Sequence, residues 1–202
     1  DAQLWAWVDR VIYDSQTWRD FRTQMKRAET AQAEAKQRIV LCDLNWTRLV
    51  QIRLALAQFF DDPTSHARFN EIESVEIESA PGFRSTALLL AGWLAGQLDW
   101  RDGKQMEQGA LSFRGPNQNE INIAFNEKAG EPIGRCAVRC GSVEFMVAHA
   151  EKADLLDVAA GERRCRMPAG QNDYVRLVGE ELMRGSPHRT YLRAMNSVRE
   201  FL

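Results

Sequence analysis

The sequence has few of the residues that metal centres and disulfide scaffolds need. It contains 4 cysteines and 3 histidines in 202 residues. The cysteines lack the close paired spacing of a zinc site and the density of a secreted disulfide protein. The histidines are scattered, without the i, i+4 pairing of a helical zinc site. We therefore expect no metal, and cysteines that are mostly reduced and structural.

Long apolar runs, a glycine-rich phosphate loop and an excess of one charge are also absent. The longest apolar run, from Ala87 to Gly96, is about half of the ~20 residues that cross a bilayer. Its glycines lie inside a predicted helix and not in a nucleotide-binding loop. The 26 basic and 28 acidic residues give a net charge of -2. We expect no membrane, nucleic-acid or dinucleotide ligand and, because the first residues do not resemble a secretory signal, a cytoplasmic protein.

The first hundred residues alternate apolar runs with helical patterns. Strands are predicted at RVIYDS, RIVLCDL and IESVEIES, and helices over about 17–37, 46–60 and 85–100. Ser85 is the predicted N-cap of the third helix. Parallel strands need crossovers of about a dozen residues, usually helices. The pattern therefore predicts an α/β fold, in which residues 1–106 form a partly parallel β-α-β-α layered unit.

The pattern changes after about residue 106 to strands without intervening helices. These strands are predicted at GALSFRG, NEINIAFN, GRCAVRCGSVEFMVAHAE, DLLDVAAG and RRCRMP. Glycine, proline and asparagine turns separate them, which is typical of an antiparallel meander. Two C-terminal helices follow, the first with Tyr174, Leu177, Val178 and Leu182 on one face. We expect residues 107–202 to form a second unit, or one continuous domain with the first.

One junction stands out because no catalytic constellation is visible elsewhere. In LCDLNWTRLVQIRLALAQFF, a buried-looking strand leads into an amphipathic helix, with Asn45 as the predicted cap. The carboxyl end of a parallel strand faces the crevice where ligands usually bind. Trp46 can be a core anchor with Arg48 solvated beside it, because tryptophan is highly buried on average. Alternatively, both side chains belong to a contact surface, since tryptophan and arginine dominate binding hot spots.

Four segments of the chain, in order, carry a family resemblance: DRVIYDSQTW, DLNWTRLVQIRLALAQFF, LLLAGWLAGQLDW and LVGEELMRGSPHRTYLRAM. Together they resemble the glucose-6-phosphate dehydrogenase assembly protein family, OpcA. The most specific part is the pattern of Asp43, Trp46, Thr47 and Arg48, followed by an arginine-bearing helix. Family members are usually longer at the N-terminus, so the resemblance implies that this chain corresponds to the later part of such a protein.

The resemblance implies a non-catalytic factor that binds glucose-6-phosphate dehydrogenase and favours its active form in the oxidative pentose phosphate pathway. It implies no catalytic residue and no cofactor. We expect Trp46, Arg48, Arg53 and Trp100 to contact the partner. Cysteine oxidation tunes activation in some cyanobacterial relatives, which suggests Cys136 and Cys140 as a redox pair. On a straight strand, however, these residues lie about 13 Å apart, beyond disulfide reach.

A small-molecule site is the alternative function. Arg48 and Arg53 would bind the anion of a sugar phosphate or nucleotide in the same crevice. Arginine suits this chemistry because its planar guanidinium matches phosphate geometry.

Overall fold

The computed structural model describes residues 7–18, 20–34, 39–61, 67–151, 154–183 and 189–202. Its first sheet is a small parallel pair, β1 (Arg10–Tyr13) and β2 (Val40–Asp43), in which Arg10 lies opposite Val40. The helix α2 (Phe21–Glu34) lies between them in the chain; it begins later than predicted, after a 3-10 turn at Ser15–Thr17, and the predicted end near residue 37 lies outside the described residues. The predicted parallel β-α-β start is confirmed.

The second sheet has eight strands in the order β10-β9-β8-β7-β3-β6-β5-β4. In chain order these are β3 (Ile72–Ser79), β4 (Arg101–Gln105), β5 (Leu111–Arg114), β6 (Glu120–Glu127), β7 (Ile133–Cys140), β8 (Val143–His149), β9 (Leu155–Ala160) and β10 (Arg163–Pro168). The pairs are antiparallel except β3 with β6, which is parallel. The predicted meander is confirmed, together with a mixed α/β fold.

The strand β3 lies far from the position expected of a third strand in the N-terminal unit. It runs between β7 and β6, at the centre of the large sheet. Its alternating side chains Val75 and Ile77 are buried, while Glu76 is exposed. Such alternation identifies a half-buried strand but not its partner, because strand pairing is non-local. Residues 72–79 thus share a sheet with the C-terminal half, and the domain boundary near residue 106 stays a prediction.

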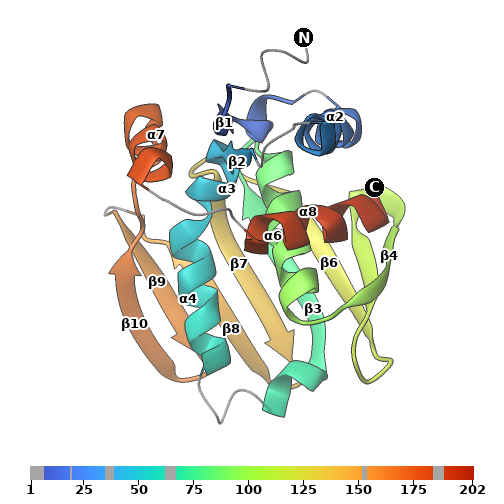
Figure 1. The fold of residues 1–202 in the computed structure, drawn as a ribbon. Coiled ribbons are helices and arrows are strands. Elements are labelled where there is room, and N and C mark those ends of the chain that lie inside the picture. Colours follow the sequence, from blue (N-terminus) through green and yellow to red (C-terminus); the bar gives the residue numbers. More distant parts are fainter. Residues whose placement is uncertain (1–6, 19, 35–38, 62–66, 152–153, 184–188) are drawn as a thin grey trace.

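Three helices lie on one side of the large sheet (Figure 1): α4 (Val50–Asp61), α6 (Arg84–Gln97) and α8 (Arg189–Phe201). The short helix α3 (Leu44–Arg48) precedes α4, and α7 (Tyr174–Met183), which contacts α3, stands above β9 and β10. The predicted helix over 46–60 is divided at Leu49 into α3 and α4. Phe59 of α4 packs on Phe145 of β8, with ring centroids 5.2 Å apart. Within the described ranges, none of the helices is long and apolar enough to span a bilayer.

The buried helix α6 packs closely against α8. A Cβ atom added to Gly92 would lie 2.4 Å from Cγ2 of Val198 and 2.6 Å from the carbonyl oxygen of Ala194. Gly92 therefore lets the two backbones approach, as its position in an apolar helix predicts. This contact joins the C-terminal helix to the segment that follows β3.

Candidate functional site

The strand β2 ends at Asp43, which forms the N-cap of α3. Its side chain accepts a hydrogen bond from the backbone N–H of Asn45 at 3.0 Å. The predicted cap, Asn45, is therefore wrong by two residues, because the helix begins at Leu44. An aspartate at this position satisfies one of the unpaired N–H groups of the first turn.

The carboxylate of Asp43 is fully buried and connects three distant segments. Ser15 donates to it from its backbone nitrogen at 2.9 Å and from its hydroxyl at 2.6 Å. The Tyr191 hydroxyl of α8 lies 3.1 Å from Oδ2 and 2.7 Å from the hydroxyl of Tyr13. Burial raises the pKa of Asp43 to about 6, although the hydrogen bonds from Ser15, Asn45 and Tyr191 oppose the rise.

The side chain of Asn45 extends this buried network to α6. Its amide nitrogen lies 3.0 Å from the hydroxyl of Ser15 and 3.3 Å from that of Ser85. Thr86 donates to its Oδ1 at 2.5 Å. Ser85 was the predicted N-cap of this helix, but α6 begins at Arg84 and its first residues have no side-chain cap. The hydroxyl of Ser85 instead accepts a hydrogen bond from the Asn45 side chain, because buried polar groups need partners.

Trp46 lies in the core and not on the surface. Its exposed fraction is 1%, and its ring lies 5.5 Å from that of Tyr191. The guanidinium of Arg53 covers the ring at 3.5 Å from its centroid and donates to the Trp46 carbonyl. This arrangement agrees with the core-anchor alternative. Trp100 is also buried, with its ring centroid 5.8 Å from that of Phe113. Neither tryptophan therefore offers an exposed contact in this conformation.

Arg48 is neither solvated nor open to an anion. Both of its terminal nitrogens donate to the carboxylate of Asp14 at 2.7 Å, and only 5% of its side chain is exposed. Burial alone would raise the pKa of Asp14, but the hydrogen bonds and charge of Arg48 hold that pKa below its usual range. The guanidinium carbon of Arg48 also lies 5.5 Å from the centroid of the Tyr174 ring. The ion pair of Arg48 with Asp14 therefore connects the end of β1 to α7.

Buried polar contacts attach α7 to this junction. Thr47 of α3 donates to the side chain of Glu181, which has no exposed surface, and Arg10 of β1 donates to the carbonyl of Glu181. Leu177 is the apolar anchor on the same side. The predicted apolar face is only partly right: Leu177 is buried, but Leu182 is 62% exposed because Glu181 occupies the inner position.

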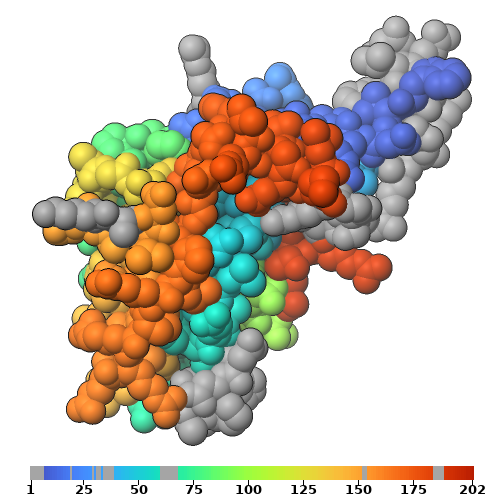
Figure 2. Space-filling model, turned by 90° about the vertical axis from the view of Figure 1, so that its left-hand side faces the viewer, coloured from blue at the N-terminus to red at the C-terminus, as the bar shows by residue number. Residues whose placement is uncertain are grey.

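The outer side of α7 carries an apolar patch that sequence reasoning missed. We call it the α7 patch: Val175, Leu182 and Met183, of which Val175 is 83% and Met183 88% exposed. In Figure 2, α7 stands out above α4 and the edge strand β10. Exposed apolar side chains that gather on one element mark binding surfaces more often than single ones do. A signal existed, because Val175 and Met183 fall outside the predicted apolar face of this helix.

The cysteines of the proposed redox pair are buried in β7. Cys136 and Cys140 are both free, and burial raises the pKa of each thiol to about 12. A thiol reacts as its thiolate, so a high pKa slows oxidation. Among the described residues, no group of three or more histidine, cysteine or acidic side chains is arranged to hold a metal ion.

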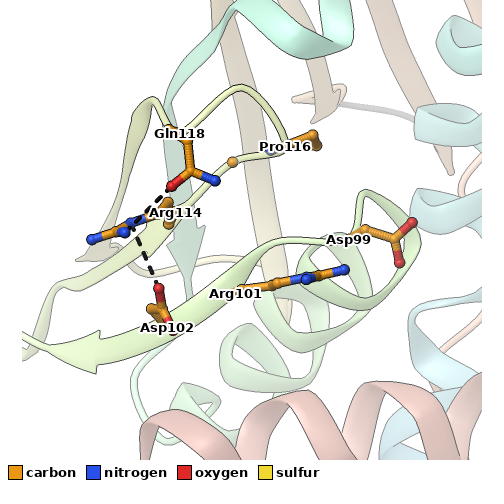
Figure 3. A pocket seen from close by; sticks show the side chains of 7 residues that line it. Asp99, Arg101, Asp102, Arg114, Pro116 and Gln118 are labelled. Atoms are coloured by element: carbon orange, nitrogen blue, oxygen red, sulfur yellow. Dashed lines mark hydrogen bonds and ion pairs between the residues drawn. The ribbon is translucent and has the colours of Figure 1, made fainter.

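A polar hollow of about 510 Å³ lies on another part of the molecule, beside β4 and β5 (Figure 3). Asp102 and Gln118 both contact Arg114, at 3.6 Å and 3.3 Å, and Asp99 pairs outside the hollow with Arg193 at 2.6 Å. Asp99, Asp102 and Gln118 all have a positive φ, which is uncommon for non-glycine residues and often found at functional sites.

Arg101 extends along this hollow in Figure 3. It is exposed, and within the described part of the chain no side chain pairs with its guanidinium. An anion can therefore reach Arg101 more readily than it can reach Arg48. Sequence reasoning did not find this hollow, because the polar edge strand RDGKQ lacks the alternation of a predicted strand.

The junction, its aspartate cap and α7 all lie within a recognised family domain. Residues 39–195 match the family described as the C-terminal domain of the glucose-6-phosphate dehydrogenase subunit. The chain belongs to this family. The proteins named OpcA from Nostoc punctiforme and Synechocystis, both assigned by name to the OxPP cycle, are similar to it at 31% and 28% identity over 137 residues. Each match covers 65% of this chain but only 28% of the relative.

Solved structures with the same fold include oxidoreductases. An oxidoreductase from Thermotoga maritima has a TM-score of 0.54 at 11% identity, over 94% of this chain and 66% of that one. The 3-ketoreductase KijD10 from Actinomadura kijaniata has a TM-score of 0.52 at 10% identity, over 95% and 68%. At these identities the likeness concerns the fold alone.

Proposed function

We propose that this chain is the dehydrogenase-binding part of an OpcA-type protein: a non-catalytic, cytoplasmic factor that binds glucose-6-phosphate dehydrogenase and favours its active form in the oxidative pentose phosphate pathway. The observation that carries this proposal is the match of residues 39–195 to a domain described as part of a glucose-6-phosphate dehydrogenase subunit. The names of the two OpcA relatives support the pathway.

The proposed mechanism is a shift of population. A binding protein activates an enzyme only if it binds the active conformation or oligomer more tightly than the inactive one. Typical coupling free energies are about 1–3 kcal/mol, which corresponds to roughly a 5- to 150-fold change in affinity. This chain needs no reactive group of its own for that purpose.

The α7 patch is our choice for the contact surface. Its three apolar side chains are exposed, and the helix that carries them is attached by a buried hydrogen bond to Thr47 of α3. A rigid helix that presents apolar anchors loses little conformational entropy on binding. Trp46, Arg48 and Arg53 then act as positioning residues, because they fix the junction under α7. Trp100, which lies near β5, supports the core in the same indirect way.

Co-elution of the chain with the dehydrogenase of its own cell tests this surface. We expect Val175→Asp with Met183→Asp to weaken binding tenfold or more, because two apolar anchors become charged. Met106→Asp is the matched control, since Met106 is 49% exposed and belongs to the segment after β4. Equal co-elution of all three proteins would reject the α7 patch, and failure of the unmodified chain to co-elute would reject the function.

Binding of a small anion is the second candidate function. The exposed Arg101 in the hollow beside β4 supports it better than Arg48 and Arg53 do, because Arg48 is already paired with Asp14. Calorimetry with glucose 6-phosphate is the test. We expect micromolar binding that Arg101→Ala abolishes if this function holds, whereas no heat of binding to the unmodified chain would exclude it.

Redox control through Cys136 and Cys140 stays a prediction. It requires β7 to open, since both thiols are buried. If oxidation lowers dehydrogenase activation equally in the unmodified chain and in Cys140→Ser, the pair plays no part.

A further inference from the structure

The large sheet has one face that no described helix covers. The helices α4, α6 and α8 all lie on the other side (Figure 1). On the uncovered face, the hydrogen-bond register aligns side chains from neighbouring strands into rows that cross the sheet. In two of these rows, the two ends of the row carry opposite charges.

The first row crosses five strands from β10 to β3. In spatial order it reads Arg164, Ala159, Met146, Ala137 and Glu76, because each residue lies opposite the next in the ladder. It therefore has a positive charge at one end, a negative charge at the other and small or apolar side chains between. Part of this row lines a hollow of about 640 Å³.

The second row is its neighbour on the same face. It reads Arg166, Asp157, Ala148, Arg135 and Glu78. Arg166 pairs with Asp157 at 2.8 Å, and both side chains remain largely exposed, at 68% and 43%. This row also has opposite charges at positions that are equally far from its centre, with Ala148 of β8 in the middle.

We propose that this face is a docking surface for a second copy of the same chain, related by a two-fold axis that runs along β8. Such an axis places β10 of one copy opposite β3 of the other, and β9 opposite β7. Arg164 then faces Glu76 of the second copy, and Arg166 faces its Glu78. A two-fold interface is isologous, so each of these pairs forms twice.

The inner positions of the rows fit the same axis. Asp157 faces Arg135 of the second copy, and Ala137 faces Ala159. Met146 and Ala148 lie on the axis and meet their own counterparts. Small side chains at the centre let two sheets approach to about 10 Å, with strands within about 30° of each other. The charged ends then surround an apolar centre, which is the usual anatomy of an interface.

A second copy fits this face better than a partner of uniform charge. A basic partner surface would meet Glu76 and Glu78 well but would repel Arg164 and Arg166, and an acidic one would do the reverse. The charge order is instead complementary to itself. This inference goes beyond the proposed function, because it concerns the open face of the large sheet and not α7, and it needs no dehydrogenase.

The test is sedimentation equilibrium of the purified chain and two charge-reversed variants. We expect a dimer for the unmodified chain, and a dissociation constant at least roughly tenfold weaker for Arg164→Glu with Arg166→Glu, because interfacial charges then repel. Glu76→Arg with Glu78→Arg should weaken it as well, although this variant also loses the pairs of Glu76 with Arg135 at 3.0 Å and of Glu78 with Lys128 at 3.7 Å within its own chain. Lys104→Glu, on the remote strand β4, is the control and should leave the dimer unchanged.

Mixing the two charge-reversed variants is the decisive step. In a mixed dimer, the reversed β10 of one variant faces the reversed β3 of the other. The unmodified β3 of the first variant likewise faces the unmodified β10 of the second, so opposite charges meet at both places. We expect mixing to restore association to near the unmodified value. A chain that stays monomeric at the highest soluble concentration, or a mixture that does not associate, overturns the proposal. Circular dichroism of each variant separates loss of folding from loss of association.

Discussion

Asp43 is the residue on which the candidate site depends most. Its buried carboxylate caps α3 and receives hydrogen bonds from the 3-10 turn and from α8. A charge in such a place is costly unless it is well solvated by donors. The raised pKa of about 6 indicates that these donors compensate only in part for burial. The same residue is the first member of the pattern on which the family resemblance rests.

Folding stability should therefore fall as Asp43 ionises. Its pKa rises from 3.8 to about 6 on folding, so its proton stabilises the folded state fully below about pH 4, and this contribution is lost as the pH passes 6. We expect the unfolding free energy of the unmodified chain, relative to Asp43→Asn, to decrease by about 2 kcal/mol between pH 4 and pH 7. Urea unfolding at both pH values measures it, and a difference that does not change with pH would contradict the expected ionisation.

Trp46 shows which part of the site the sequence could predict. The residue types at the junction marked Trp46 as important but left two interpretations open, because tryptophan after a buried strand is as consistent with a core anchor as with a partner contact. Its burial depends on Tyr191, which lies 145 residues later in the chain, and on Arg53 covering the ring. A local pattern cannot reveal which distant side chain fills the space beside it.

At the scale of elements, the strands of the second half were the most predictable feature. Their alternation and their glycine turns depend on neighbouring residues only. The location of β3 was not predictable in the same way, because its alternation is equally compatible with either sheet. The exposed side of α7 was missed for a further reason: a buried glutamate, Glu181, occupies a position where an apolar residue is normally expected.

The contact between α6 and α8 gives a prediction at this scale. Gly92→Ala should lower the unfolding free energy by about 1–3 kcal/mol, because the new Cβ would overlap Val198 and the backbone of Ala194. Gly179→Ala on α7 is the matched control. No atom lies within 4 Å of its added Cβ, so helix propensity should stabilise it by about 0.5–1 kcal/mol. Thermal melts of both variants provide the check, and equal effects would disprove the close contact.

At the scale of the whole molecule, one sheet connects surfaces that face different directions. The helical side carries the junction and α7, the opposite side carries the self-complementary rows, and the edge at β4 and β5 holds the polar hollow. Only the junction on the helical side was suggested by the sequence. The other two depend on strand order, which brings Arg164 and Glu76 into one row although 88 residues separate them in the chain.

The central claim is that this chain acts through glucose-6-phosphate dehydrogenase. The most direct test titrates the purified chain into that enzyme from its own cell and measures the Michaelis constant for glucose 6-phosphate. We predict a saturable decrease of about 5-fold or more, which is the effect expected of a protein that binds the active form preferentially. Val175→Asp with Met183→Asp should shift the titration to higher concentration. A Michaelis constant and a maximal rate that stay unchanged at saturating chain would contradict the account.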